Sequence, residues 1–211
     1  MENLTKIFST LGASNHSKGD RIEFDFYATP SYTIEDLLTI YPLLIPKKYS
    51  IWEPACGLGH LSIPLKEKGF DVFSSDIHDH GYQDIDELFD FLKPIDTSQL
   101  LQLQEYQKQH SHTAIVTNPP YKQAQQFVER SIELLKKDGD IVCMFLKVLF
   151  LESQKRRILF DKYPPKYVAV YSKRVSCANN GDFSKQQSSA IAYAWYIWEK
   201  GYTGNSILKW I

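Results

Sequence analysis

The sequence has few of the residues that build a disulfide framework or a metal centre, and it has no long apolar run. Its three cysteines, Cys56, Cys143 and Cys177, show no C-x-x-C spacing, so we expect no disulfides and no metal site, and a reducing compartment fits. No apolar stretch approaches the ~18 residues of a membrane span. Residues 1–14 lack the layout of a signal peptide. The sequence therefore predicts a cytoplasmic protein without membrane contact.

An excess of charge of one sign is also missing. The 24 Lys and Arg residues nearly balance the 25 Asp and Glu residues, which leaves a net charge of −1. This balance excludes a uniformly basic coat for nucleic acid, although it allows a local basic face. The hydrophobic content of 43% is that of an ordinary globular chain. The aromatic content of 14% is unusual, because aromatic side chains fill cores and also stack on bases.

The apolar pattern alternates between strands and helices. The length of 211 residues suits one domain, and we expect a loose segment at 1–24, a single domain at 25–211 and an inserted helix at 93–112. The expected strands are Tyr49–Glu53, Asp71–Asp76, Thr113–Thr117, Ile141–Phe145, Tyr167–Tyr171 and Ala190–Trp198. The expected helices are Tyr32–Leu44, a stretch ending at Lys68, Ala124–Lys137 and Glu152–Phe160. This alternation predicts an α/β fold with a mostly parallel sheet covered on both faces, whose ligands bind beyond the carboxyl ends of the strands.

A glycine loop separates the first of these strands from the helix after it. The loop reads Glu53-Pro54-Ala55-Cys56-Gly57-Leu58-Gly59. Glycines there permit positive φ and close approach of the backbone to a ligand, and the amides of a helix N-terminus favour an anionic group. The loop lacks the third glycine of a dinucleotide fingerprint and the lysine of a phosphate loop. Glu53 would repel a pyrophosphate and instead suits a cationic group such as an ammonium.

A second acid, Asp76, ends the next strand, 23 residues after Glu53. A carboxylate at this place can bind the two hydroxyls of a ribose. An ammonium and a ribose together indicate S-adenosyl-L-methionine rather than NAD as the cofactor. The alternative is an ordinary strand-to-helix turn with Glu53 exposed to solvent.

The tetrapeptide Asn118-Pro119-Pro120-Tyr121 follows a third strand and is the more specific motif. Its prolines remove backbone donors and stiffen the loop, which leaves the carbonyls of Asn118 and Pro119 and the Asn118 amide oxygen as acceptors. Such an array suits a planar NH2 group, and Tyr121 can stack on the ring that carries the amine. The alternative is a Pro-Pro turn with Tyr121 in the core.

The chemistry of an exocyclic amine explains this arrangement. The amine is a poor nucleophile because its lone pair is delocalised into the ring. Hydrogen bonds that draw its protons out of the plane localise the lone pair toward an incoming methyl group. Catalysis then rests on placement and oriented dipoles rather than on a strong base.

These motifs, in this order, resemble those of the amino-group DNA methyltransferases, especially the N6-adenine type. Asp25-Phe26-Tyr27-Ala28-Thr29-Pro30 is similar to the family's N-terminal cofactor motif, and Asp90-Phe91-Leu92 to the step that holds the cofactor adenine. The similarity covers roughly residues 25–200, and with the Trp-rich end 194–200 the layout looks like small phage- and prophage-borne methyltransferases. The resemblance implies a Rossmann-like class I methyltransferase fold of seven strands, with one antiparallel strand near the edge.

The resemblance also implies roles for the matching residues. Tyr27, Thr29 and Pro30 would border the methionine part of the cofactor. Glu53 would hold its amino group, and Asp76 its ribose. The main cofactor loop would consist of Ala55, Cys56, Gly57 and Gly59.

The other matching residues surround the cofactor adenine and the target. Asp90 would accept from the adenine amine, and Phe91 would pack on that ring. The catalytic residues would be Asn118, Pro119, Pro120 and Tyr121, with Tyr121 stacked on the target base. For Tyr27 a place in the core is the alternative, and for Asp90 a solvated surface position.

The sequence departs from the family at two places. Many relatives carry a large target-recognition region, whereas here only 93–112 and 172–189 are available to read a sequence. We therefore expect the recognition of the DNA sequence to be loose, supplied by a partner, or formed by a homodimer. His60 follows Gly59 where a further small residue is common. It would either cover the cofactor or cap the next helix, and we favour the cap.

Contact with DNA would fall to a few local groups. The predicted nucleic-acid-binding residues are Lys155, Arg156, Arg157, Lys173, Arg174 and Phe183. The cations would make salt-dependent phosphate contacts, and Phe183 would offer a second stacking face. A base in a duplex must flip out to reach Asn118. The alternative for both basic runs is a solvated surface.

The sequence thus predicts S-adenosylmethionine-dependent methyl transfer to N6 of adenine in DNA, with a flipped-out base. The alternatives are N4 of cytosine, an amino group of ribosomal RNA, a protein glutamine, and an inactive decoy that binds cofactor or DNA. The element Tyr27-Ala28-Thr29-Pro30 favours adenine, and the intact tetrapeptide argues against the decoy. Glu53 and the missing third glycine disfavour an oxidoreductase.

Overall fold

The computed structural model describes residues 27–94, 101–179, 181–185 and 191–211. The predicted loose segment at 1–24 lies outside the described residues, as do Asp25, Phe26 and the stretches 95–100 and 186–190. Within the described ranges, no helix has the length and apolar character needed to cross a membrane.

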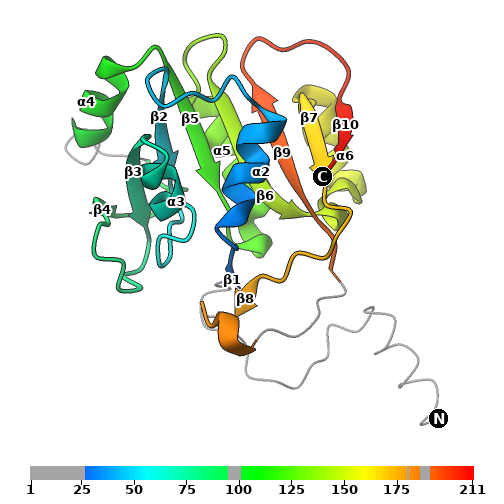
Figure 1. Ribbon diagram of the computed structural model, residues 1–211. Helices are drawn as coiled ribbons and strands as arrows, with labels where there is room; N and C mark the ends of the chain where they lie inside the picture. Colours follow the sequence, from blue (N-terminus) through cyan, green and yellow to red (C-terminus); the bar gives the residue numbers. More distant parts are fainter. Residues whose placement is uncertain (1–26, 95–100, 180, 186–190) are drawn as a thin grey trace.

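An eight-stranded sheet forms the centre of the domain (Figure 1), in the order β10-β7-β9-β6-β5-β2-β3-β4. The strands are β2 Tyr49–Glu53, β3 Asp71–Asp76, β4 Glu87–Leu88, β5 His112–Thr117, β6 Ile141–Lys147, β7 Tyr167–Val170, β9 Tyr193–Glu199 and β10 Ile207–Trp210. Strand β9 is antiparallel to its neighbours β6 and β7, and the other pairings of this sheet are parallel. The predicted, mostly parallel sheet with one antiparallel strand is confirmed.

The sheet has eight strands where seven were expected, and the additional strand is β10. It pairs in parallel with β7 and forms the edge of the sheet, so the antiparallel β9 lies third from that edge. Ile207, Leu208 and Trp210 are all exposed. A strand with apolar residues facing solvent lacks the alternation that marks a strand in a sequence, and this explains why β10 was not predicted.

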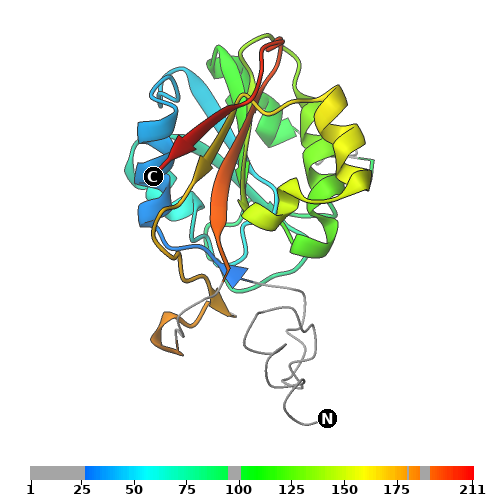
Figure 2. The same ribbon diagram turned by 90° about the vertical axis from the view of Figure 1, so that its right-hand side faces the viewer.

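Helices cover both faces of the sheet, as expected (Figure 2). The helices are α2 Tyr32–Ile40, α3 Ser62–Glu67, α4 Leu101–Gln109, α5 Ala124–Leu134 and α6 Gln154–Lys162. Helices α2 and α3 pack on one face, and α5 and α6 on the other. Successive residues of a strand point to opposite faces, so Ile51 of β2 belongs to the first core and Trp52 to the second.

Helices α2 and α5 end earlier than predicted. The predictions were too long because buried apolar residues continue past the last turn of each helix. Tyr41 follows α2 with φ −125° and ψ 75°, and Leu135 follows α5 in an extended conformation. Both side chains are buried, so their apolar spacing looked helical. Pro64 lies in the first turn of α3, where a proline is tolerated.

The predicted helix within 93–112 is α4. It contacts β2 and β3 and connects β4 to the parallel strand β5. Its described part is therefore a crossover connection of the fold itself rather than an insertion into it.

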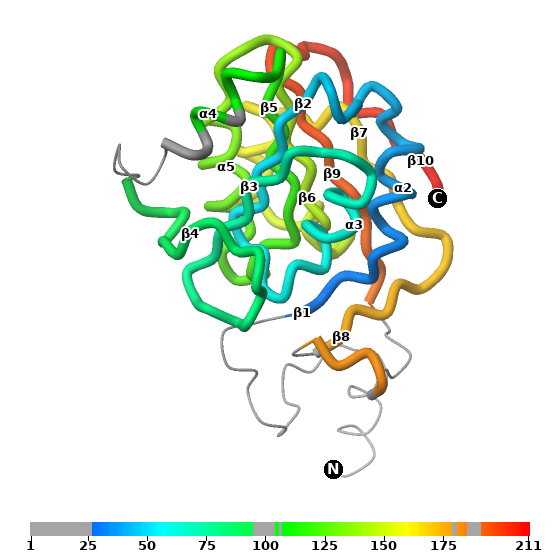
Figure 3. Tube along the Cα trace, turned by 60° about the vertical axis from the view of Figure 1, so that its left-hand side comes forward, coloured from blue at the N-terminus to red at the C-terminus, as the bar shows by residue number. Residues whose placement is uncertain are grey.

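A second, two-stranded sheet lies at the carboxyl ends of the parallel strands (Figures 1 and 3). Strand β1, Tyr27–Ala28, pairs antiparallel with β8, Ala178–Asn179. The beginning of the described chain and the loop after β7 meet there. Short 3-10 helices among the described residues are η2 Tyr121–Gln123, η3 Val148–Leu151 and η4 Phe183–Lys185.

Candidate active site

The two sequence motifs meet at the centre of the sheet. Strands β2 and β5 are neighbours, and the chain leaves β2 toward β3 but leaves β5 toward β6. Such a reversal leaves a crevice at the carboxyl ends of the strands. Glu53 ends β2 and Asn118 follows β5. A cavity of about 370 Å³ opens at this place.

Most of the predicted cofactor and catalytic residues line this cavity. They are Tyr27, Thr29, Glu53, Ala55, Cys56, Asp76, Asp90, Phe91, Asn118, Pro119, Pro120 and Tyr121. Pro30, Gly57 and Gly59 are close in sequence to the lining residues but do not line the cavity themselves. Its walls also include residues that the sequence analysis did not assign to the site, among them His60, His78, His80 and Lys122.

The glycine loop is held against the end of β3. Gly57 and Gly59 have φ values of 55° and 78°, which confirms the positive φ expected of them. The Gly57 amide donates to Asp76 Oδ2 at 2.9 Å. A Cβ on Gly59 would lie 2.5 Å from the ring of Tyr82, so no larger residue fits there without displacing that ring.

Glu53 is a buried acid at the floor of the cavity. It is only 2% exposed, which rules out the alternative of a solvent-exposed turn residue. Its carboxylate accepts a hydrogen bond from Ser62, whose Oγ lies 2.7 Å from Ser74 Oγ. Burial raises the pKa of Glu53 to about 8, although the bond from Ser62 opposes the rise. A cation bound beside Glu53 would favour the carboxylate form.

Asp76 both supports the loop and faces the cavity. The residue is buried, with 6% of its surface exposed. Besides the bond from Gly57, Oδ1 accepts from the His78 amide at 3.1 Å and lies 3.7 Å from His80 Nε2. The carboxylate is thus fixed in orientation at the end of β3.

The predicted adenine-binding step forms one wall. Phe91 stacks on Phe127 with ring centroids 5.0 Å apart, and its ring lies edge-on to Trp52 at 5.1 Å. Asp90 is half-buried, and its Oδ1 accepts from the Leu92 amide at 3.0 Å. Asp90 lines the cavity, and its Oδ2 also lies 3.7 Å from Lys93 Nζ, so its role toward the adenine stays a prediction.

Asn118 is held by its amide nitrogen and leaves its amide oxygen unpaired. Nδ2 donates to the carbonyl of Tyr27 and to Thr29 Oγ1, both at 2.8 Å. Within the described part of the chain, Oδ1 is buried and has no hydrogen-bond partner. An unsatisfied buried acceptor costs about 1–3 kcal/mol, and such groups are rare enough in proteins to suggest a binding role.

Tyr121 belongs to an aromatic cluster at the side of the cavity. Its hydroxyl lies 3.2 Å from that of Tyr193, and its ring centroid lies 5.4 Å from that of Tyr27. Burial raises the pKa of Tyr121 well above its ordinary value, so the ring is neutral. Lys147 Nζ lies 4.0 Å from the ring centroid. Sequence reasoning missed Lys147, although a lysine directly after the apolar run 141–146 was a usable signal.

The predicted basic run on α6 does not reach the cavity. The Arg156 guanidinium donates to the backbone carbonyls of Phe150, Leu149 and Glu152, so it closes the end of η3 and is largely committed to the backbone. Arg157 Nε lies 3.4 Å from Asp161 Oδ2, and Lys155 is exposed.

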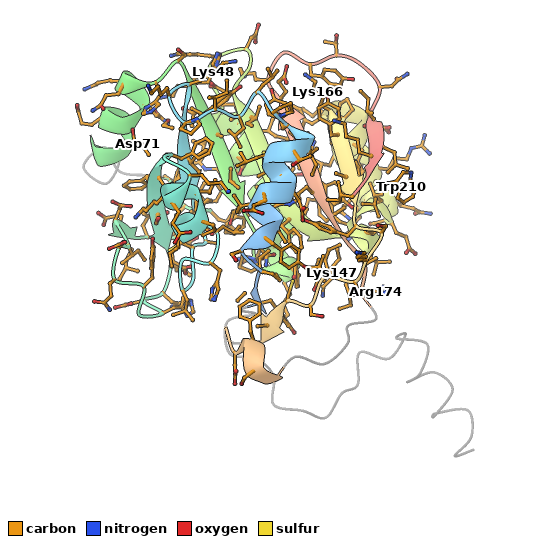
Figure 4. The ribbon with its side chains drawn as sticks, viewed as in Figure 1. Lys48, Asp71, Lys147, Lys166, Arg174 and Trp210 are labelled. Carbon is orange, nitrogen blue, oxygen red and sulfur yellow. The ribbon has the colours of Figure 1, made fainter. Side chains whose placement is uncertain are left out.

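The other predicted nucleic-acid contacts lie nearer the mouth of the cavity. Lys173 and Arg174 are exposed after β7, and Figure 4 shows Arg174 and Lys147 at the same edge of the domain. The ring of Phe183 lies 5.4 Å from that of His60. Helix α3 has no side-chain cap, so the expectation that His60 caps it is wrong; the ring borders the cavity instead.

Comparison with known proteins identifies the fold. No protein-family model matches the chain, and no curated protein matches its sequence. A candidate RNA methyltransferase from Pyrococcus horikoshii has a TM-score of 0.54 at 15% identity, over 95% of this chain and 99% of that chain. An S-adenosylmethionine-dependent methyltransferase from Anabaena variabilis has a TM-score of 0.55 at 12% identity, over 83% and 86%. The chain has the class I methyltransferase fold.

A third structure with this fold is a complex with DNA. The DrdV–DNA complex has a TM-score of 0.52 at 13% identity, and the match covers 100% of this chain but 29% of the DrdV chain. At these identities the likeness establishes the fold alone. The fold predicted from the sequence motifs is therefore confirmed, apart from the eighth strand.

Proposed function

We propose that this protein binds S-adenosyl-L-methionine in the cavity and transfers its methyl group to an exocyclic amine, with N6 of adenine in DNA as the substrate. The observation that carries the proposal is the amide oxygen of Asn118. It is a buried acceptor without a partner, and the two bonds from Nδ2 fix its orientation. An NH2 group placed in the cavity would supply the missing donor.

The residues of the cavity fit the cofactor. Its volume of about 370 Å³ is in the range of small-molecule sites. Glu53 is buried and would hold the α-amino group, and Asp76 would hold the ribose hydroxyls. Asp90 and the rigid ring of Phe91 would bind the adenine. When bound, the cofactor supplies a methyl group on a positively charged sulfur.

The residues around Asn118 would orient the amine for attack. Asn118 Oδ1 and the Pro119 carbonyl would each accept a hydrogen bond from the amine and so localise its lone pair toward the methyl group. The neutral ring of Tyr121 would stack on the base that carries the amine. Placement by fixed dipoles supplies the catalysis, so no strong base is required.

The surroundings of Tyr121 favour a nucleotide over a protein glutamine. Tyr27 and Tyr121 give an aromatic surface beside the amine site, and Lys122 and Lys147 place cations next to it. Aromatic rings with neighbouring cations match the bases and phosphates of a nucleic acid, whereas a glutamine side chain has neither. The fold is also compatible with DNA, because DrdV carries it in a DNA complex.

The substrate can be determined by testing the alternatives in parallel reactions. The protein is incubated with methyl-labelled cofactor and, separately, with DNA, RNA and a glutamine-containing peptide, and the products are analysed by mass spectrometry. We expect N6-methyladenine in the DNA. Label only in cytosine, RNA or peptide would contradict the adenine assignment, and no label in any of them would contradict methyl transfer itself.

The role of Asn118 is tested by Asn118→Ala. We expect methyl transfer to fall by at least ~10²-fold, as for other pre-oriented catalytic amides, while the affinity for S-adenosylhomocysteine changes little. Asn205→Ala is the matched control, because Asn205 is an exposed asparagine outside the cavity. A mutant at position 118 as active as this control would refute the role of the amide oxygen.

A further inference from the structure

The mouth of the cavity carries opposite charge on its two sides. Residues 76–93, which follow β3 and include β4, contain six acids and one lysine. The segments 118–123, 147–151 and 171–177, which lie at the ends of β5, β6 and β7, contain no acid. Their cations are Lys122, Lys147, Lys173 and Arg174. An anionic polymer is therefore attracted to the β5–β7 side and repelled from the β3–β4 side.

Lys147 is a cation of this side whose ammonium lies over the ring of Tyr121. It is the last residue of β6, and its Nζ lies 4.0 Å from the ring centroid of Tyr121 and 5.9 Å from that of Tyr27. Figure 4 shows Lys147 at the edge of the domain where the parallel strands end. The ammonium thus lies within contact distance of the ring on which the target base would stack.

The contact of the Lys147 ammonium with the Tyr121 ring is weaker than the contact that the ammonium would make with a nucleotide phosphate. A cation over an aromatic ring gains less than an ammonium that donates a charge-assisted hydrogen bond to a phosphate. A base stacked on Tyr121 carries its backbone phosphates within reach of a flexible lysine side chain. The exchange of the ring for a phosphate is therefore favourable once a nucleotide enters.

We propose that Lys147 binds the backbone phosphate next to the target nucleotide and thereby positions the target amine at Asn118. Lys147 is a positioning residue and takes no part in methyl transfer. The inference rests on the proposed function, in which the substrate is a nucleic acid whose target base stacks on Tyr121 with its amine at Asn118. It assigns the main phosphate contact to the end of β6 rather than to the basic run on α6.

The test replaces single phosphates in the ligand. A single-stranded oligodeoxynucleotide with one adenine is bound in the presence of S-adenosylhomocysteine, and binding is measured by fluorescence anisotropy. Each phosphate that flanks the adenine is replaced in turn by a neutral methylphosphonate. At one of the two linkages the wild type should lose about tenfold in affinity, the value of one charge-assisted bond.

Variants of Lys147 make the assignment specific. Lys147→Met should bind the unmodified strand about tenfold more weakly than the wild type does. A methylphosphonate at the sensitive linkage should not weaken the binding of this variant further. Lys147→Arg should keep the sensitivity. Lys108→Met is the control with the same loss of charge, because Lys108 is exposed on α4, and it should behave as the wild type. With the unmodified strand, Lys147→Met should raise KM and leave kcat nearly unchanged.

Two results would overturn the inference. One is an equal loss for wild type and Lys147→Met at both linkages, which would show that Lys147 contacts neither phosphate. The other is a fall in kcat at constant KM, which would show that Lys147 acts only by holding Tyr121. A failure of the proposed function is separate, because it would appear as an absence of methyladenine with the wild type.

Discussion

A glutamate ends a strand at each of the two ends of the sheet, and the pKa values of these two glutamates are shifted in opposite directions. Glu199, at the amino edge of the parallel strands, accepts from Tyr41 Oη and Lys166 Nζ, both at 2.6 Å. Burial alone would raise the pKa of Glu199, but these two bonds outweigh it and hold the pKa below its ordinary value. Glu53, at the carboxyl edge, accepts from a serine, and its pKa rises to about 8.

Amide and carboxylate oxygens show the same contrast. Asp140, at the amino edge, is 2% exposed and accepts from the backbone amides of Thr113, Lys136 and Lys137. Asn118 Oδ1, at the carboxyl edge, is buried without a partner among the described residues. The fold itself thus satisfies Asp140 with three backbone donors, whereas Asn118 Oδ1 is an acceptor that a donor group of a ligand would satisfy.

Asp140→Ala should give the largest effect on stability and so test the amino edge. Three amides would lose their acceptor, and we expect the free energy of unfolding to fall by about 3 kcal/mol. Urea denaturation measures the change. Asp138→Ala, at an exposed position of the same turn, should change stability little. Equal effects of the two substitutions would show that Asp140 does not stabilise this edge.

Glu53→Gln should separate ligand binding from stability at the carboxyl edge. Loss of the charged bond to the ammonium should weaken S-adenosylhomocysteine binding by ~10–100-fold, measured by calorimetry. The unfolding free energy of the free protein should not fall. Because the pKa of Glu53 is raised, its contribution to the stability of the wild type is complete below pH ~4.5 and is lost as the pH rises toward 8. Glutamine does not titrate, so the variant should not lose stability over this pH range.

Glu199→Gln is the matched substitution at the other edge. The lowered pKa of Glu199 contributes stability above its ordinary pKa, and this is lost as the pH falls through the folded value. The variant should therefore be less stable than the wild type at neutral pH and bind the ligand normally. If both glutamine variants behaved alike, the contrast between the edges would be wrong.

The pH dependence of binding sharpens the same comparison. Below pH 8 the free protein holds Glu53 protonated, and binding the ammonium requires the carboxylate. Affinity for S-adenosylhomocysteine should rise by up to about tenfold per pH unit between pH 6 and 8 and then level off. Glu53→Gln should show no such rise, and a pH-independent wild type would contradict the assignment of Glu53 to the amino group.

Phe183→Ala should have the smallest effect. The ring of Phe183 contacts His60 at the rim of the cavity, and an aromatic pair is worth about 0.5–1.5 kcal/mol. We expect S-adenosylhomocysteine to bind about threefold more weakly, with unchanged stability toward urea. A loss of DNA binding with normal ligand affinity would instead support the predicted role of Phe183 as a stacking face for DNA.

Much of the cofactor side could be predicted because its residues are close in sequence. Glu53, Gly57, Gly59 and Asp76 fall within two strands and one turn, so strand ends and turn chemistry alone place them together. The place of the tetrapeptide at Asn118 was predictable for a different reason. Its neighbouring strand ends at Glu53, and adjacent parallel strands end at one edge of a sheet.

The parts that sequence reasoning missed depend on contacts between distant segments. Lys147 meets Tyr121 only because β5 and β6 pair, and Arg156 is committed to the backbone only because η3 turns toward α6. Strand β10 follows an exposed loop and pairs with β7 some 40 residues earlier. No local pattern reports such a contact.

The pairing of β1 with β8 has a consequence for the synthesis of the chain. The carbonyl of Tyr27 helps to hold the Asn118 amide, and Tyr27 itself pairs with Asn179. A nascent chain on the ribosome acquires Glu53, Asp76 and Asn118 long before Asn179 is translated. The hydrogen bond from the Asn118 amide therefore reaches a strand, β1, whose pairing partner β8 is made only when the chain has been translated as far as Asn179.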